Sequence, residues 1–573
     1  MARTVGIGIQ SYCDIIKKGC FYVDKTSFIR EWWESEDSVT LITRPRRFGK
    51  TLTMSMVEQF FSVEYAGRGD LFEGLSIWRE EEYRALQGTY PVISLSFANL
   101  KEKSYEITRK KICQILTDLY ADHSFLLNST ELEGSDREYF RRVTIDMDDA
   151  DASMALHNMA KYLSRYYGKK AIILLDEYDT PMQEAYVDGY WEELAAFTRS
   201  LFNSTFKTNP WLERAIMTGI TRVSRESVFS DLNNLKMVTT TSDEYALSFG
   251  FTEEEVFAAM DEYGYSNKQE VKLWYDGFVF GTHRGIYNPW SILNYLDTGK
   301  LTTYWANTSS NSLAGKLIRE GSPEVKTIME DLLNGKVLRT QIDEQIVFTQ
   351  LGQKRNSIWS LLLASGYLKA ENYVLNPDKG RPEYELALTN KEVRLMFEDM
   401  IEDWFAGDTV PYNEFIKALM LGDLDAMNEY MNQVTLEIFS SFDTGKRPSG
   451  KTEPEQCEAD ASHFYHGFVL GLMVDLRERY VITSNREERK ASCACFGRYD
   501  VVLEPLSEAD DAIIIEFKVH NSRRGQDLEE TLQNALRQID EKKYEMSLLS
   551  RGIPAERIRK YGFVFDGKTV LIG

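Results

Sequence analysis

The run Gly49-Lys50-Thr51 has the residue types and the setting to bind a nucleotide. It follows a predicted strand, Val39 to Thr43, and opens a predicted amphipathic helix, Leu52 to Phe61. At such a junction, exposed backbone N–H groups and the helix dipole hold phosphate. Lys50 would reach the β- and γ-phosphates of ATP, and the Thr51 hydroxyl would ligate Mg²⁺. The pattern therefore predicts a P-loop.

The loop before this run departs from the usual P-loop pattern, which has glycine where Arg44 stands. The first turn of the loop must therefore differ, and Arg46 or Arg47 can add positive charge near the phosphates. We expect the whole loop to bind the nucleotide, namely Arg44, Pro45, Arg46, Arg47, Phe48, Gly49, Lys50 and Thr51.

A second apolar run, Ile172 to Leu175, ends in two carboxylates, Asp176 and Glu177. Asp176 would hold the Mg²⁺ shell with Thr51, while Glu177 would orient and deprotonate the attacking water. A buried strand that ends in two exposed carboxylates is the alternative. The presence of both halves of the pattern favours ATP binding and hydrolysis.

A third apolar run, Ala215 to Ile220, leads into Thr221 and Arg222. Ligands bind at the carboxyl ends of the strands in parallel sheets, so these polar residues are candidates for the same site. Arg222 would sense the γ-phosphate, or it is an ordinary surface arginine, and the sequence leaves both interpretations open.

The C-terminal part of the chain offers a second set of reactive groups, Asp500, Glu516 and Lys518. Glu516 and Lys518 lie two residues apart in the strand-like run Ile513 to Val519, so they face the same side of the strand. With Asp500 from a neighbouring strand, two carboxylates can ligate Mg²⁺ while the lysine positions water and stabilises developing phosphate charge. Taken alone, Glu-x-Lys among apolar residues is more typical of a solvated strand edge.

These residues require a fold that positions them. From Ser38 to Ile220, apolar runs alternate with longer helical stretches, which indicates a parallel sheet covered by helices. From about Thr252 to Tyr430 the pattern is mostly helical, and a helix followed by a hairpin between Ser357 and Leu388 suggests a winged helix. Such modules bind DNA in some proteins and only pack on the nucleotide domain in others.

The chain of 573 residues exceeds the roughly 250–300 residues at which single cores stop growing. We predict an α/β protein with three parts: a P-loop domain over residues 1–245, a helical and winged-helix-like region over 246–440, and a linker with a compact α/β domain over 441–573. The formal charge of −22 opposes non-specific attraction to polyanions, so nucleic acid must bind at local basic patches.

The sequence gives little indication of export or of insertion into a membrane. No apolar run approaches the ~20 residues that a membrane helix needs, so we expect no membrane partner. The N-terminus lacks a secretory signal, and the six cysteines are scattered, which favours reduced thiols and a cytoplasmic protein.

Six motifs resemble, in order over nearly the whole chain, a large bacterial family of AAA-ATPase-like proteins with a C-terminal PD-(D/E)XK nuclease domain. They are Tyr22-Val23-Asp24-Lys25-Thr26, the loop from Arg44 to Thr51, Leu175-Asp176-Glu177-Tyr178-Asp179, Gly219-Ile220-Thr221-Arg222, Trp274-Tyr275-Asp276-Gly277 and Tyr287-Asn288-Pro289-Trp290. In that family the Arg-Pro-Arg-Arg-Phe-Gly-Lys form replaces the first glycine of the loop.

The resemblance also implies a restriction-endonuclease-like fold for the C-terminal domain. The helix Leu528 to Tyr544, which carries Gln538, resembles the final motif of the family, so Gln538 joins the candidate catalytic residues. The helix Phe464 to Leu476 resembles the first nuclease helix, although the acidic residue that such nucleases often place there is not obvious.

The leading hypothesis is an ATPase, with ATP and Mg²⁺ or Mn²⁺ as cofactors, joined to a nuclease-like domain that acts on DNA or RNA. One alternative is an ATP-driven regulator whose nuclease-fold domain binds without cutting. Another is an interaction protein that uses bound ATP for stability only. The sequence leaves the oligomeric state open.

Overall fold

The computed structural model forms two compact units, Met1–Leu313 with Val337–Arg394 and Ala314–Lys336 with Leu395–Gly573. The residues that it describes are 2–221, 228–229, 232–306, 312–319, 323–343, 356–376, 381–405, 412–438, 469, 473, 476, 479–484, 501–507, 510–520, 527–566 and 569–573.

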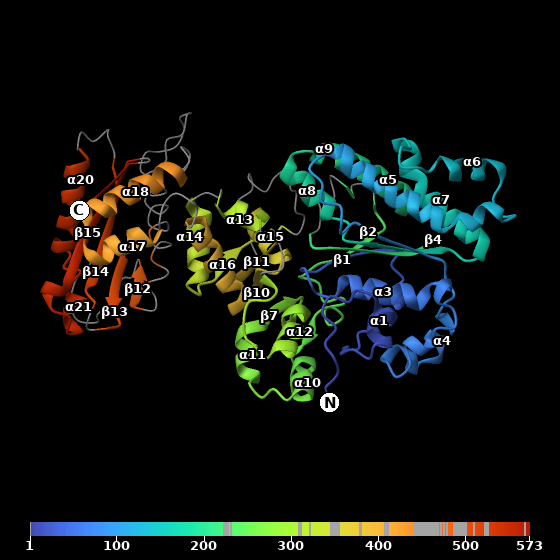
Figure 1. Ribbon diagram of the computed structural model, residues 1–573, viewed down its shortest axis with the longest axis horizontal. Coiled ribbons are helices and arrows are strands. Elements are labelled where there is room, and N and C mark those ends of the chain that lie inside the picture. Colours follow the sequence, from blue (N-terminus) through green and yellow to red (C-terminus); the bar gives the residue numbers. More distant parts are fainter. Residues whose placement is uncertain are drawn as a thin grey trace. The chain divides into compact units, whose positions relative to one another are not determined.

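A parallel sheet of five strands lies at the centre of the first unit (Figure 1), so the predicted parallel sheet is confirmed and β5 is added to it. Its order is β2-β3-β4-β1-β5, and every neighbouring pair is parallel. The strands are β1 (Val39–Thr43), β2 (Val92–Ser96), β3 (Ala171–Asp176), β4 (Leu212–Gly219) and β5 (Leu235–Val238). All residues of β1 and β3 are buried, because helices cover both faces of the sheet.

Two groups of helices cover the two faces of this sheet (Figure 1). One group comprises α5 (Tyr105–Asp122), α6 (Gly134–Arg142), α7 (Asp149–Tyr167), α8 (Thr180–Asp188) and α9 (Trp191–Phe206). The other comprises α1 (Tyr12–Lys17), α2 (Ser27–Glu34), α3 (Lys50–Phe61) and α4 (Glu81–Leu86). Aromatic residues of the second group, including Tyr12, Trp32 and Phe60, are fully buried in a cluster against the sheet.

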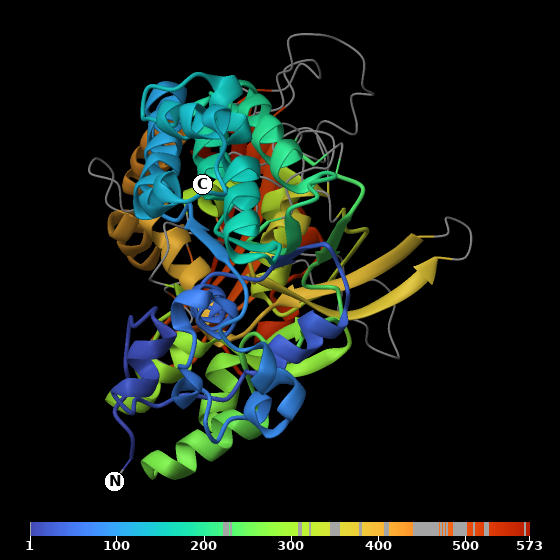
Figure 2. The same ribbon diagram turned by 90° about the vertical axis from the view of Figure 1, so that its right-hand side faces the viewer.

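A smaller set of elements completes the first unit. Three helices, α10 (Glu253–Tyr263), α11 (Lys268–Tyr275) and α12 (Pro289–Thr298), share a core and lie beside an antiparallel sheet of β6 (Phe251–Thr252), β7 (Asp276–Phe280) and β8 (His283–Tyr287). Next come β9 (Leu338–Thr340), α15 (Ser357–Ala364) and the long antiparallel hairpin of β10 (Leu368–Asn376) and β11 (Arg381–Leu388) (Figure 2). The predicted helix and hairpin are confirmed, while the winged-helix assignment stays a prediction.

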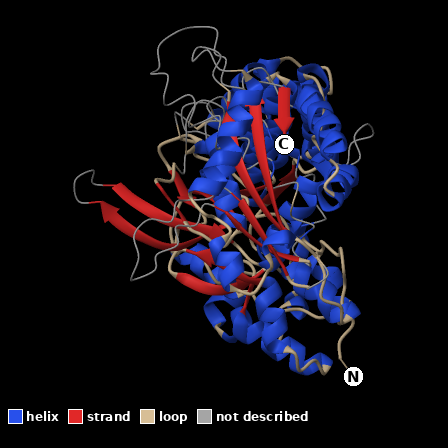
Figure 3. Cartoon of the chain, turned by 90° about the vertical axis from the view of Figure 1, so that its left-hand side faces the viewer, coloured by secondary structure: helices blue, strands red, loops and turns tan. Residues whose placement is uncertain are grey.

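The second unit contains a mixed sheet of five strands in sequential order, visible among the red arrows of Figure 3. The strands are β12 (Tyr480–Ser484), β13 (Val501–Pro505), β14 (Ala512–Val519), β15 (Ile558–Asp566) and β16 (Thr569–Ile572). Only β14 and β15 pair in parallel among the described strand pairs of this sheet. The mixed sheet confirms the predicted α/β class for this part of the chain.

Helices pack on both faces of the second sheet. Residues of α17 (Tyr412–Leu421) and α18 (Leu424–Ile438) share one core with it, and residues of α20 (Leu528–Glu541) and α21 (Met546–Ser550) share another. Two side-chain amides of α18, Asn428 and Asn432, form hydrogen bonds with the backbone of the edge strand β16.

The remaining described α-helices are α13 (Ser312–Arg319), α14 (Pro323–Leu333) and α16 (Lys391–Phe405). No described helix combines the length and apolar character needed to cross a bilayer.

The start of β7 gives the first testable prediction. Gly277 has a φ of 136°, and a Cβ built there would lie 1.9 Å from the carbonyl oxygen of Thr389. Gly277→Ala should therefore destabilise the first unit by ~3 kcal/mol or more, through backbone strain and a clash that no side-chain rotation relieves. The melting temperature measures this loss.

Gly168→Ala is the matched control, because Gly168 also has a positive φ, of 68°, but open space around its Cα. It should cost only about 1–2 kcal/mol, the strain of a left-handed residue. Equal shifts in melting temperature for the two variants would contradict the close approach of Gly277 to Thr389.

Candidate functional site

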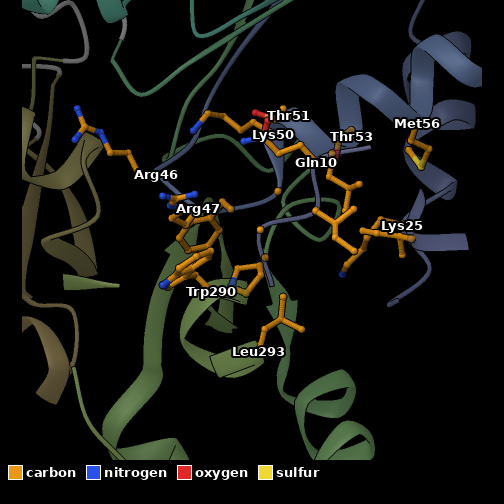
Figure 4. A pocket seen from close by; sticks show the side chains of 18 of the residues that line it. Gln10, Lys25, Arg46, Arg47, Lys50, Thr51, Thr53, Met56, Trp290 and Leu293 are labelled. Carbon is orange, nitrogen blue, oxygen red and sulfur yellow. The ribbon is translucent and has the colours of Figure 1, made fainter. Parts of the chain in front are cut away.

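The loop after β1 borders a cavity of about 380 Å³ (Figure 4). Its walls come from the N-terminal segment around Ile9 and Gln10, the segment from Phe21 to Lys25, the loop itself with the start of α3, and the start of α12 at Trp290. The cavity thus joins segments that are far apart in the sequence. Its size falls within the range of small-molecule sites.

Lys50 lies inside the loop, with only 4% of its surface exposed. Its Nζ donates hydrogen bonds to the carbonyl oxygens of Arg44, at 3.0 Å, and Pro45, at 2.9 Å. Burial lowers the pKa of this ammonium group, and the nearby carboxylates of Glu177 and Asp176 oppose that shift. Such a cation, solvated by carbonyl dipoles alone, is suited to meet an anion that enters the loop.

Asp176 lies at the end of β3 and connects three elements. Its Oδ2 accepts a hydrogen bond of 2.6 Å from the Thr51 hydroxyl, and its Oδ1 accepts one from the hydroxyl of Thr218 on β4. Thr51 and Asp176 therefore offer adjacent hydroxyl and carboxylate oxygens, which are ligands that Mg²⁺ prefers. The donor set fits the metal that the sequence predicts.

Glu177 also borders the cavity. Its φ is 52°, a backbone conformation that is rare for residues other than glycine and clusters at functional sites. Its N–H donates to the Thr218 hydroxyl at 3.3 Å, and the Thr180 hydroxyl donates to its carboxylate at 3.1 Å. Thr218 thus contacts both acidic residues, a role that the sequence analysis did not assign.

A further buried carboxylate, Asp179, holds the turn that follows β4. Its Oδ2 accepts hydrogen bonds from the N–H groups of Ile220, at 3.0 Å, and Thr221, at 2.8 Å, and from the Thr221 hydroxyl, at 2.7 Å. Burial raises the pKa of this carboxyl group. The motif from Leu175 to Asp179 contains this residue, but spacing alone does not reveal its partner.

Arg44 and Pro45 differ from the rest of the loop, because neither is among the residues that line the cavity. The Arg44 side chain is fully buried and donates to the carbonyl oxygens of Thr43, Thr239 and Glu244. Its guanidinium also lies 4.5 Å from the ring centre of Phe280. These contacts hold the base of the loop, and the expected contact of Arg44 with the nucleotide stays a prediction.

The other loop residues border the cavity, and two of them also contact helical elements. Arg47 stacks over Trp290, with its guanidinium carbon 4.4 Å from the ring centre, as Figure 4 shows. Arg46 extends away from the Trp290 ring and lies 3.4 Å from the amide oxygen of Gln183. Phe48 is buried edge-on against Phe278.

The second candidate site brings together three of its expected residues in the second unit. Glu516 on β14 is 2% exposed, and its Oε1 accepts a hydrogen bond of 3.1 Å from Lys518. Gln538 on α20 accepts one of 2.7 Å from the same lysine and donates to Glu516. Asp500 and Arg222 lie outside the described residues. Within the described part of the chain, no cluster of three or more His, Cys, Asp or Glu side chains forms a metal site.

Comparison with known proteins agrees with this two-part arrangement. Residues 6–229 match the family model of a predicted AAA-ATPase, and residues 461–573 match that of the PD-(D/E)XK nuclease superfamily. The expected family architecture is confirmed. The AAA-ATPase-like match contains the whole loop, Asp176, Glu177 and Thr218, and the nuclease-superfamily match contains Glu516, Lys518 and Gln538.

A relative from Azotobacter chroococcum mcd 1 is similar over a longer stretch. This protein, described as an uncharacterized protein in the vnfD 5′ region, is 25% identical over 410 residues, which cover 70% of each chain. This similarity extends over more residues than either family match, and the description of the relative names no activity.

Thr218 gives the second testable prediction. Thr218→Val removes the hydroxyl that binds Asp176 and accepts from the Glu177 N–H, while it keeps the shape of the side chain. The variant should lower the turnover of ATP by about ten- to a hundredfold, the worth of a hydrogen bond to a charged group. Steady-state ATPase assays measure the change.

Thr218→Ser is the matched control, because it keeps the hydroxyl and removes only a methyl group. It should stay within a fewfold of the parent rate. A Thr218→Val protein with parental turnover would show that this hydroxyl does not organise the two carboxylates.

Proposed function

We propose that the first unit binds ATP and hydrolyses it with Mg²⁺, as expected for an AAA-ATPase-like protein. The observation that carries this proposal is the 2.6 Å hydrogen bond between the Thr51 hydroxyl and Asp176, beside the buried Lys50 and next to the same cavity as Glu177. These are the groups that a P-loop hydrolase needs, brought together at the end of β3 and the start of α3.

The cavity also supports a binding mode for the nucleotide. The phosphates lie on the N–H groups of the loop and at the N-terminus of α3, where the helix dipole favours negative charge. The lining of the cavity also includes apolar side chains, among them Ile9, Met56 and Leu293, which suit the base and the sugar. Arg46 and Arg47 add positive charge to the lining.

Each polar group then has one task. Lys50 exchanges its carbonyl partners for phosphate oxygens, which are stronger acceptors because they are charged. Thr51 and Asp176 would hold Mg²⁺, which would supply positive charge against the β- and γ-phosphates. Glu177 accepts a hydrogen bond from water in line with the γ-phosphate and takes up its proton. Arg222 is the proposed contact to the γ-phosphate.

We further propose that Glu516, Lys518, Gln538 and Asp500 form a metal-dependent phosphodiester site for DNA or RNA. The contacts among the first three support a positioned carboxylate and ammonium. Glu516 and Asp500 would ligate Mg²⁺ or Mn²⁺, while Lys518 positions water and stabilises charge on the scissile phosphate. The alternative is a nuclease-fold domain that binds nucleic acid or protein without cutting, regulated by the ATPase.

The loop lysine and the second carboxylate give the third testable prediction. Lys50→Ala should abolish ATP binding and hydrolysis, since it removes the ammonium group buried in the loop. Glu177→Gln should bind ATP normally but hydrolyse it about 10²–10⁴-fold more slowly, because the amide cannot take up a proton. Equilibrium binding of a fluorescent ATP analogue and phosphate release measure the two effects separately.

Lys25→Ala is a control for Lys50, because Lys25 also borders the cavity but forms an ion pair with Glu255. It should reduce ATP affinity far less than Lys50→Ala. If Glu177→Gln hydrolyses ATP at the parental rate, Glu177 is not the base that takes up the proton of water.

The second site gives the fourth testable prediction, made on the full chain. Mg²⁺ or Mn²⁺ should raise the melting temperature of the second unit and support cleavage of labelled DNA or RNA, because a cation stabilises a site that binds it. Glu516→Ala should remove the metal shift and the cleavage. Lys518→Ala should keep the metal shift and lose the cleavage at least ~10²-fold, because lysine stabilises charge without binding metal.

Glu504→Ala is the matched carboxylate control, since Glu504 lies on β13 and pairs with Arg551 instead. It should change neither property. If the parent protein shows a metal shift but cuts no DNA or RNA, the binding-only alternative replaces the nuclease proposal.

A further inference from the structure

The backbone carbonyl of Arg46 is held from outside the cavity. It accepts a hydrogen bond of 3.0 Å from the indole N–H of Trp305 and one of 3.2 Å from the side-chain amide of Asn288. Trp305 and Asn288 are not among the residues that line the cavity, whereas Arg46 and Arg47 are. The carbonyl therefore points away from the space that the phosphates would fill.

Because the peptide bond is planar, the direction of this carbonyl also fixes the direction of the next N–H group. In a trans peptide the C=O and the following N–H point in opposite directions. Because the Arg46 carbonyl is fixed toward Trp305 and Asn288, the N–H of Arg47 points away from both, and Arg47 itself borders the cavity. Arg47 and Gly49 also have positive φ angles, of 65° and 81°, as found where successive N–H groups form an anion-binding concavity.

Trp305 itself is positioned by a buried carboxylate, Glu392. One oxygen of Glu392 accepts hydrogen bonds from the N–H groups of Tyr304, at 2.5 Å, Trp305, at 2.6 Å, and Ala306, at 3.4 Å. The other oxygen accepts one of 2.8 Å from the Ser291 hydroxyl of α12. Glu392 is 1% exposed, so water cannot take the place of these hydrogen-bond partners.

The Trp305 ring is also fixed by its neighbours. It is 2% exposed and packs edge-on against Phe278, with ring centres 5.6 Å apart, while Phe278 in turn packs against Phe48 of the loop. The indole N–H therefore has little freedom to leave the Arg46 carbonyl.

We propose that Trp305 and Glu392 are positioning residues for the phosphate-binding loop, a role that rests on the proposed ATP binding of the first unit. Trp305 fixes the peptide between Arg46 and Arg47, so that the Arg47 N–H is ready to bind phosphate. Glu392 fixes the backbone of Trp305. Neither residue contacts the nucleotide, and both act by reducing the reorganisation that binding requires.

The kinetics distinguish this role from a general loss of stability. A preformed donor that binds phosphate equally in the ground state and the transition state changes KM and leaves kcat unchanged. A variant that is only partly folded shows the reverse, because fewer active molecules lower the apparent kcat at an unchanged KM.

The test uses Trp305→Phe in the full chain, which keeps an aromatic ring and removes the N–H donor. Its Kd and KM for ATP should rise about three- to tenfold, the worth of one hydrogen bond, while kcat stays within twofold of the parent. Glu392→Leu should raise the Kd at least as much. Glu392→Gln should instead keep the Kd within twofold of the parent value, because its amide oxygen still accepts the hydrogen bonds from the backbone N–H groups.

Trp32→Phe is the matched control, because Trp32 is a fully buried tryptophan of the same unit whose N–H has no acceptor in the described structure. It should leave the Kd for ATP unchanged. A Trp305→Phe protein with parental Kd and KM, or with lower kcat at unchanged KM, would overturn the positioning role. A parent protein that binds no ATP would instead overturn the proposed function, so the two failures are distinct.

Discussion

The carboxylate of Asp176, held between two threonine hydroxyls, is the contact on which the nucleotide site depends. In the sheet order β3-β4-β1, the loop after β1 must reach across β4 to meet the end of β3. Thr51 makes this reach from α3, and Thr218 fills the intervening position on β4. The parallel order of three strands therefore places Lys50 and Glu177 at one cavity. A shift of any of these strands would separate Lys50 and Thr51 from Asp176 and Glu177.

Charges in the interior of the first unit are solvated mainly by the backbone. Carbonyl oxygens bind the cations of Lys50 and Arg44, and N–H groups bind the carboxylates of Asp179 and Glu392. Burial raises the pKa of both carboxyl groups, and these hydrogen bonds oppose the shift. Backbone dipoles move only when the fold itself changes. Buried charges that they solvate therefore fix the conformation of a loop, although removing those charges from water costs free energy. Lys50 differs from the other three groups in the proposed function, where phosphate oxygens replace its two carbonyl partners.

Much of this arrangement could be predicted from local sequence, and the rest depends on distant partners. The central strands are readable because a covered parallel sheet requires continuous apolar runs, and Glu516 and Lys518 because strand side chains alternate. The burial of Arg44 was not predictable, because its acceptors at Thr239 and Glu244 lie about 200 positions later in the chain. The same holds for the bond from Trp305 to Arg46, which joins residues 259 positions apart. Spacing shows which residues can do chemistry, but it does not show which distant groups hold them.

The described residues of the second site, Glu516, Lys518 and Gln538, come from one strand and one helix. Glu516 pairs in register with Gly562 of β15, and a Cβ at Gly562 would lie 2.7 Å from Leu532 and 3.1 Å from Ala535 of α20. The missing side chain therefore lets α20 approach the sheet next to Glu516, so that Gln538 reaches both the carboxylate and Lys518. Even an alanine at position 562 would have to displace the end of the Leu532 side chain and crowd Ala535, although Gly562 itself carries no reactive group. The geometry of this site is thus set by close packing on the neighbouring strand, whereas that of the nucleotide site is set by strand order.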